Sequence, residues 1–249
     1  MPEFTLVSFN THYGLGPLRD DCGPYDLFGA LAGLGEPDVF VIQEVWRPDG
    51  NTGVVDEFAT AHGYERHDLE FSRATITKRW PHAAVDGEGT VGLAILTRIP
   101  ARPVAALRLG PTIGDHIPLR RALHVELEVA STPVDLVGVH LTSRLPHGPP
   151  MQLRRLAHAL PPPERPTIIA GDCNFWGPGV LRLLPGFRRA VVGRTWPAPR
   201  PHSQIDHVLL RGAIDVDAAE VVGPVGSDHR PVRVRLRVNE TMHEEYGVN

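Results

Sequence analysis

The sequence predicts a layered α/β sandwich, and two observations favour this fold over a singly wound sheet. Nine segments have the apolar patterns of strands, whereas only three have the patterns of helices, and these three are scattered along the chain. Several strand segments are almost continuously apolar, as expected of strands that are covered on both faces. Many strands with few helices fit stacked sheets better than one sheet wound by alternating helices.

The nine expected strands are short and spread over the whole chain. They lie at residues 4–10, 38–44, 91–97, 122–129, 134–141, 167–172, 205–211, 215–222 and 232–238. The last of them, VRVRLRV, alternates apolar and charged residues, so one of its faces should be solvated.

Helices are expected at residues 24–34, 52–62 and 149–160. The third follows prolines, and its leucines at positions 153, 156 and 160 share one face. The Pro-rich stretches are typical of loops, and none is long enough for a linker between domains. We therefore expect residues 1–249 to form a single domain, with a tail at about residues 239–249 that we expect to be disordered.

The composition is that of an ordinary globular protein. The 249 residues are 42% hydrophobic and 22% charged, and they suffice to bury a sizeable core. No run approaches the roughly 18 apolar residues of a membrane span. The N-terminus, MPEFTLVSFN, has no basic region and is typical of a strand, not of a signal peptide. We therefore expect a cytoplasmic protein with no membrane span.

Cysteine content and net charge exclude or disfavour other classes. Cys22 and Cys173 are too few for a disulfide framework or a cysteine-based zinc site. The net charge of −4 disfavours a protein that coats nucleic acid, although it leaves room for a local basic groove.

Polar side chains stand at or near the ends of six apolar strands. They are Asn10, Glu44, His140, Asp172 with Asn174, Asp206, and Asp228 with His229. Each alone has an ordinary interpretation: Asn10 suits a turn, and Asp172 with Asn174 could equally form an Asx turn or face a site. Together they predict one shared site if the strands are neighbours.

The donor types at these strand ends indicate a metal and a reaction class. Carboxylate and amide oxygens without a thiolate cluster favour Mg²⁺, or Mn²⁺ as a substitute, over zinc. A hard divalent cation beside carboxylates and two histidines fits hydrolysis of a phosphate ester, in which an ionised carboxylate takes a proton from water.

The order of the motifs resembles the endonuclease/exonuclease/phosphatase superfamily. The series SFN, QE, HL, GDCN, IDHV and SDHRPV runs in family order from residue 8 to 232, and GDxN and SDHxPV are its most specific elements. The resemblance implies a deoxyribonuclease I-like fold, a four-layer α/β/β/α sandwich with two packed sheets that are mainly antiparallel or mixed.

The resemblance also implies a role for each matched residue. Glu44 would bind the essential Mg²⁺, with Asn10 and Asp228 contributing directly or through water. Asp172 would activate or orient the attacking water, and Asn174 would hold this water and the scissile phosphate.

The remaining matched residues would act on the phosphate. His229 would contact it and be oriented by Asp206, and His140 would donate to a non-bridging oxygen as charge builds there. Arg121 matches a position that could reach the substrate, although a structural surface arginine fits it equally well. Thr195 and Trp196 match an element that packs beneath the site.

The substrate stays open between several classes. The leading expectation is a Mg²⁺-dependent phosphoesterase acting on a phosphodiester or phosphomonoester, with no protein partner predicted. One alternative is a DNA-acting nuclease or DNA-end-processing phosphodiesterase, which would make nucleic acid a partner. Two further alternatives are a zinc-dependent site and an inactive binding domain of the same fold. The intact motifs argue against the inactive domain. Residues 66–90 are expected to form a polar loop, with four basic residues that either bind phosphate or are solvated: Arg66, Arg73, Lys78 and Arg79.

Overall fold

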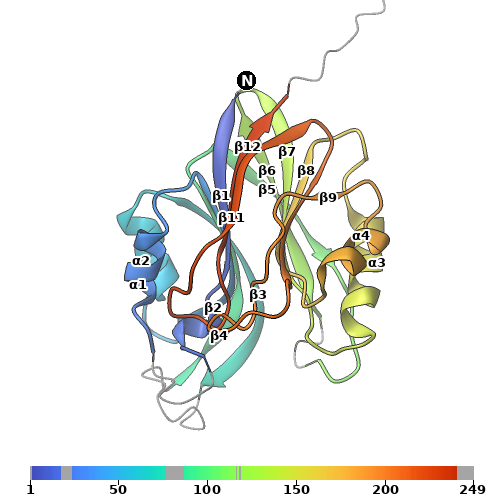
Figure 1. Cartoon of the computed structure of the whole chain (residues 1–249). Helices are drawn as coiled ribbons and strands as arrows, with labels where there is room; N and C mark the ends of the chain where they lie inside the picture. Colours follow the sequence, from blue (N-terminus) through green and yellow to red (C-terminus); the bar gives the residue numbers. More distant parts are fainter. Residues whose placement is uncertain (1, 18–23, 77–86, 116, 118, 240–249) are drawn as a thin grey trace, which may run out of the picture.

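Two six-stranded sheets are stacked face to face in the computed structural model, which describes residues 2–17, 24–76, 87–115, 117 and 119–239 (Figure 1). The first sheet contains, in spatial order, β11 (Ile214–Val221), β12 (Val232–Val238), β1 (Glu3–Asn10), β2 (Val39–Pro48), β4 (Gly87–Thr97) and β3 (Glu65–Ile76). The second contains β5 (Ala101–Arg108), β6 (Arg121–Val129), β7 (Thr132–His140), β8 (Thr167–Asp172), β10 (Asp206–Arg211) and β9 (Arg188–Arg189).

Both sheets are mixed. In the first, β1 and β2 run parallel, and in the second, β7 and β8 do, while the other neighbouring strands pair antiparallel. The mixed character agrees with the expectation from the sequence.

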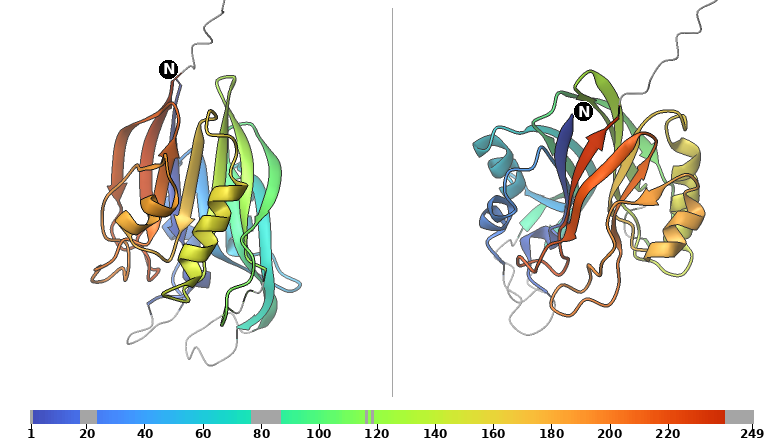
Figure 2. Two further views of the ribbon diagram at one scale, coloured as in Figure 1. Left: turned by 90° about the vertical axis from the view of Figure 1, so that its right-hand side faces the viewer. Right: turned by 45° about the horizontal axis from the view of Figure 1, so that its top comes forward.

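Helices cover the outer faces of the two sheets (Figures 1 and 2). α1 (Leu27–Gly33) and α2 (Val54–Ala61) pack on the first sheet, and α3 (Gly148–Ala159) and α4 (Gly177–Leu183) pack on the second. A single turn of 3-10 helix, η1 (His12–Gly14), follows β1. The predicted four-layer α/β/β/α sandwich is therefore confirmed.

Strand alternation divides the core into three layers. Leu6 faces the space between the sheets, whereas its neighbour Val7 faces α1 and α2. In the second sheet Ile168 points between the sheets and Ile169 toward α3 and α4. Both faces of the central strands are thus buried, which explains why these strands are continuously apolar in the sequence.

The nine expected strands and three expected helices are all present, with ends shifted by a few residues. The strands missed from the sequence are β3, β5 and β9, and each of them lies at an edge of its sheet. Edge strands are more exposed and more polar than central ones, so they lack the apolar run that marks the others. The short helix α4 was also missed.

The expected polar loop at residues 66–90 was wrong for most of its length. Residues up to Ile76 belong to β3, and residues from Gly87 belong to β4, with which β3 pairs antiparallel. The segment reads as polar because β3 is an edge strand. Residues 77–86, with Lys78 and Arg79, lie outside the described residues, as do residues 240–249 of the expected tail. In the described part of the chain no helix is long and apolar enough to cross a membrane.

Candidate active site

The polar strand ends meet at one end of the sandwich, opposite the N-terminus (Figure 1). β1 with β2, and β7 with β8, are parallel pairs, so their carboxyl ends lie together. β12 and β10 run antiparallel to β1 and β8, so their amino ends reach the same edge. This topology brings together all eight residues expected at the catalytic and metal sites: Asn10, Glu44, His140, Asp172, Asn174, Asp206, Asp228 and His229.

Asn10 joins the two sheets at the centre of the site. Its side-chain amide, fully buried at the end of β1, donates to Glu44 Oε1 and to Asp172 Oδ2, each at 3.1 Å. Its Oδ1 accepts from the backbone N–H of His12 at 3.0 Å, and Ser227 Oγ donates to its backbone carbonyl at 2.7 Å. Because both amide hydrogens are used on carboxylates, Asn10 fixes their separation and orientation.

Glu44 occupies a bulge in β2. The register with β4 shifts between Gln43 and Val45, and Glu44 has a φ of 55°. A bulge leaves one residue out of the ladder and redirects its side chain. Burial, and to a smaller extent the nearby Asp228 carboxylate, raise the pKa of Glu44 above its ordinary value, against the opposite effect of His12, His229 and Asn10.

Asp172 is held by its own loop as well as by Asn10. Its Oδ1 accepts from the backbone N–H of Asn174 at 2.7 Å, and its Oδ2 from Asn174 Nδ2 at 3.2 Å. Asn174 has a φ of 46° and also donates to the carbonyl of Leu141 at 2.9 Å. Burial, followed by the charge of Asp206, raises the pKa of Asp172 to about 7. From the sequence alone, Asp172 with Asn174 could form an Asx turn or face a site. In the structure the two residues do both.

Cys173, between these two residues, points the other way. Its thiol is fully buried among the apolar residues beneath α3 and α4. The expected alternation along GDCN is therefore confirmed.

His229 and Asp206 form a buried pair. His229 Nδ1 lies 2.9 Å from Asp206 Oδ2 and 3.0 Å from Oδ1, and both side chains are almost fully buried. Burial by itself lowers the pKa of His229, but the charges of Asp206, Asp172 and Asp228 raise it to about 10. The ring is therefore positively charged at neutral pH. Its other nitrogen, Nε2, faces Asp172 Oδ2 at 3.9 Å and Asp228 Oδ1 at 4.0 Å.

His140 has the opposite charge state. It ends β7 beside Asp172, and its Nε2 lies 3.6 Å from Glu44 Oε1. Burial, and then the positive charges of Arg120 and His229, hold the pKa of His140 well below its ordinary value. One imidazole of the site is thus neutral and the other charged.

Thr195 and Trp196 support the site from below, as expected. The Thr195 hydroxyl accepts from the backbone N–H groups of Ile205 and Asp206, both at 3.2 Å. Trp196 Nε1 donates to Asp228 Oδ2 at 3.3 Å. Thr195 therefore fixes the backbone that carries the Asp206 carboxylate, and Trp196 fixes the side chain of Asp228.

A cavity of about 400 Å³ opens above these groups, and we call it the catalytic cavity. Glu44, His140, Asp172, Asn174 and His229 line it. So does Arg73, one of the four basic residues for which the sequence left phosphate binding or solvation open. Three further lining residues were not selected from the sequence: Tyr13, Arg120 and Arg144.

Arg121 does not line the catalytic cavity, whereas its neighbour Arg120 does. Arg121 Nη2 donates to the backbone carbonyl of Glu70 at 2.6 Å, which ties β6 to β3. Arg120 is buried, pairs with Asp115 through Nε at 2.7 Å, and donates through Nη1 to the carbonyl of His140 at 2.9 Å. The double arginine in the sequence was the available signal. Arg120 precedes β6, and its bonds to Asp115 and to the His140 carbonyl hold it at the cavity.

Strained backbone marks the same place. Within the described residues, six residues other than glycine have a positive φ, and four of them lie at this site: His12, Tyr13, Glu44 and Asn174. Such conformations cost about 1–3 kcal/mol each and persist where the surrounding structure imposes them, often at functional sites.

The residues present fit a hard divalent cation. Glu44 Oε2 is buried and has no hydrogen-bond partner among the described residues, although a buried carboxylate oxygen needs one. Asp172, Asp206 and His229 also lie close enough to hold a metal. In that group, however, Asp206 and His229 are already hydrogen-bonded to each other. The unpartnered oxygen of Glu44 is therefore the stronger indication of a cation site.

The chain is similar to known proteins in its sequence pattern and in its fold. The model of the Endonuclease/Exonuclease/phosphatase family matches residues 7–229. A crystal structure of an endonuclease/exonuclease/phosphatase from Beutenbergia cavernae DSM 12333 superposes with a TM-score of 0.71 at 21% identity, covering 96% of this chain and 72% of that one. No curated protein sequence matches this chain significantly.

Two further solved structures share the fold. D. rerio TDP2 complexed with a single-strand DNA product gives a TM-score of 0.60 at 17% identity, covering 95% of this chain and 99% of that one. The human Nocturnin catalytic domain with bound sulfate gives 0.64 at 15% identity, covering 96% and 94%. At these identities the likeness concerns the fold alone.

Proposed function

Since the chain belongs to the endonuclease/exonuclease/phosphatase family, we propose that it is a Mg²⁺-dependent phosphoesterase that hydrolyses a phosphodiester or phosphomonoester with an activated water. The observation that carries the proposal is the hydrogen-bonded unit of Glu44, Asn10 and Asp172, which lies between a neutral and a charged histidine. This unit offers a cation site, a proton acceptor and two hydrogen-bond donors around one point.

Glu44 would hold the cation through its unpartnered Oε2, with Asp228 and Asn10 contributing directly or through water. The cation supplies neutralisation of the charge that develops on the phosphoryl group. Mn²⁺ has the same preference for oxygen ligands and should substitute for it.

Asp172 would take one proton from the attacking water as the water oxygen bonds to phosphorus. The bond from phosphorus to the leaving oxygen breaks, and that oxygen keeps the electron pair. Asn174, fixed by Asp172 and the Leu141 carbonyl, would orient the water and the phosphate. Asp172 is suited to this role because its carboxylate is oriented by three N–H groups before substrate arrives.

The two histidines would bind the phosphoryl oxygens in different ways. His229, charged and held by Asp206, would provide an ionic hydrogen bond. His140, neutral, would donate a hydrogen bond from Nε2 to a non-bridging oxygen as negative charge builds there.

A nucleic-acid phosphodiester is the second candidate substrate. Arg73, Arg120 and Arg144 line the catalytic cavity, and cationic side chains are what a polyanionic backbone requires. Two of them already have acidic partners, since Arg120 pairs with Asp115 and Arg73 with Asp49. The D. rerio TDP2 structure, which has the same fold, holds a single-strand DNA product. The cytoplasmic location expected from the sequence stays a prediction.

A phosphoester panel tests the proposal. It would contain single- and double-stranded DNA and 4-nitrophenyl mono- and diesters, together with inositol phosphates and sphingomyelin, each with Mg²⁺, Mn²⁺, Zn²⁺ or chelator. We expect hydrolysis that requires Mg²⁺ or Mn²⁺ and is lost in His229→Ala but kept in His158→Ala, a control at an exposed position of α3. Hydrolysis of no ester would contradict the proposal and favour the inactive binding domain. Activity with Zn²⁺ alone would contradict the Mg²⁺ assignment.

A further inference from the structure

A second cavity, of about 300 Å³, adjoins the catalytic cavity, and Tyr13 belongs to the walls of both. We call it the side recess and define it by Tyr13, Tyr25, Phe28, Trp46, Pro48 and Val54. It lies between η1, the end of β2 and the amino ends of α1 and α2. The Tyr13 side chain also makes a hydrogen bond with Glu44, so the recess borders the proposed cation site.

The chemical character of the side recess is apolar and aromatic. No lysine or arginine is among the described residues that line it, and the two charged residues that do are acidic: Asp26 and Glu57. The amino end of α2 offers little attraction to an anion, because Asp56 and Glu57 already occupy its first turn. A second phosphate group would therefore be repelled from the recess.

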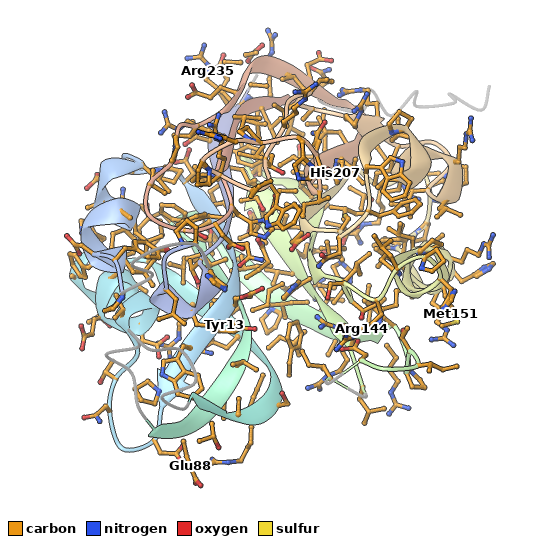
Figure 3. The ribbon with its side chains drawn as sticks, turned by 60° about the horizontal axis from the view of Figure 1, so that its bottom comes forward. Tyr13, Glu88, Arg144, Met151, His207 and Arg235 are labelled. Carbon is orange, nitrogen blue, oxygen red and sulfur yellow. The ribbon has the colours of Figure 1, made fainter. Side chains whose placement is uncertain are left out.

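The catalytic cavity has the opposite character on its other side. Arg120 and Arg144 line it there together with Asp115, which pairs with Arg120. In Figure 3, Tyr13 lies on the side of α1 and α2 and Arg144 on the side of α3. A substrate phosphate at Asp172 would thus have an apolar compartment on one side and a polar one, with charges of both signs, on the other.

Trp46 lines the recess as one of its aromatic residues. Its side chain is 7% exposed, and its indole N–H, which has no hydrogen-bond acceptor among the described residues, is closed off from solvent. Trp46 therefore adds apolar ring surface to the recess and no accessible hydrogen-bond donor.

We propose that the side recess binds an uncharged aromatic substituent of the substrate, so that the preferred substrate is a phosphodiester with an aryl or heterocyclic ester group. This inference rests on the proposed function of the neighbouring site. The volume suits it, since a cavity of about 150 Å³ already binds benzene and the recess has room for one or two rings. A phosphomonoester of an alcohol without an aromatic ring would leave the recess empty.

Two chromogenic diesters with the same leaving group test the proposal. Bis(4-nitrophenyl) phosphate carries a second ring, whereas methyl 4-nitrophenyl phosphate carries a methyl group in its place. We expect Val54→Asp, at a half-exposed wall position, to lower kcat/KM for the diaryl ester at least about tenfold and to leave the methyl ester unchanged. The two esters differ in intrinsic reactivity, and this difference cancels when the ratio of their kcat/KM values is compared between variant and wild type.

Val192→Asp is the matched control, because Val192 is 73% exposed and lies outside the recess. It should leave the ratio of the two kcat/KM values at the wild-type level. If Val54→Asp also leaves that ratio unchanged, the proposal is overturned.

Binding of diphenyl phosphate, measured by calorimetry, separates this inference from the proposed function. If neither diester is hydrolysed but wild type binds diphenyl phosphate and Val54→Asp does not, the recess stands and the catalytic proposal fails. If both diesters are hydrolysed and diphenyl phosphate binds both proteins equally, the recess proposal fails alone.

Discussion

Asn10 and Asp172 are 162 positions apart and belong to different sheets, yet a hydrogen bond of 3.1 Å joins Asn10 Nδ2 to Asp172 Oδ2. The same Asn10 amide holds Glu44, so one side chain sets the distance between the proposed cation ligand and the proposed base. Activity should therefore depend on how the two sheets are packed as well as on the residues of each.

Replacing Asp172 with Asn should abolish the proton acceptor and keep the fold. We expect kcat to fall by about 10²–10⁴, the range attributed to a general base. Thermal stability should fall modestly, because both Asp172 oxygens accept N–H groups and an amide side chain would turn one of them into a donor. Steady-state kinetics and calorimetric melting check both points. Asp215→Asn on β11 is the control, and equal activities of the two variants would refute the assignment of Asp172.

Replacing Glu44 with Gln should separate cation binding from folding. Wild type should gain stability with Mg²⁺, about 2.7 kcal/mol at one hundred times Kd, whereas Glu44→Gln should gain much less. Without metal the variant should be at least as stable as wild type, since burial raises the pKa of Glu44 and so penalises its charge. Melting curves with and without Mg²⁺ measure this, with Glu128→Gln at an exposed position as control. An equal Mg²⁺ response in all three proteins would contradict the prediction.

The pair of Asp115 and Arg120 should make stability depend on pH at the acid end. Burial raises the pKa of Asp115, but the Arg120 guanidinium outweighs it and holds the value below the ordinary one. A depressed carboxyl pKa contributes stability that is present above the unfolded pKa of about 3.9 and is lost as pH falls through the folded value.

Asp115→Asn should therefore cost about 2–3 kcal/mol of unfolding free energy at pH 7, because it leaves a buried guanidinium unpaired. The difference from wild type should shrink as pH falls below about 4. Urea unfolding between pH 3 and 8 measures it. A difference that is constant over this range would show that the pair does not titrate as described.

Gly171, directly before Asp172, should tolerate no side chain. Its φ is 139°, and a Cβ there would lie 1.9 Å from the backbone oxygen of Val139. We expect Gly171→Ala to lower the unfolding free energy by at least about 2 kcal/mol, since the clash is with backbone that cannot move freely. Gly33→Ala in α1 is the control, because a Cβ there meets nothing within 4 Å. Urea unfolding of the two variants compares them, and equal stabilities would contradict the predicted clash.

The sequence predicted the central part of the fold because central strands are buried on both faces. Segments such as TIIAG are apolar throughout, and this pattern is independent of partners. The edge strands β3, β5 and β9 lack it, so their pairing becomes visible only in three dimensions. The polar segment that begins at Arg66 is a strand because β4 supplies its hydrogen bonds, which no local pattern records.

The sequence by itself also determined which residues meet at the candidate site, since Asn10 and Asp172 end apolar strands, His229 precedes one, and Glu44 follows the apolar run of β2. Their charge states, the choice of Arg120 over Arg121 and the side recess were decided by the tertiary structure alone. The physical reason is that burial and the distances between charges set a pKa, while hydrogen bonds and bulges set the direction of a side chain. Both depend on segments far apart in the chain, as the bond from Asn10 to Asp172 illustrates.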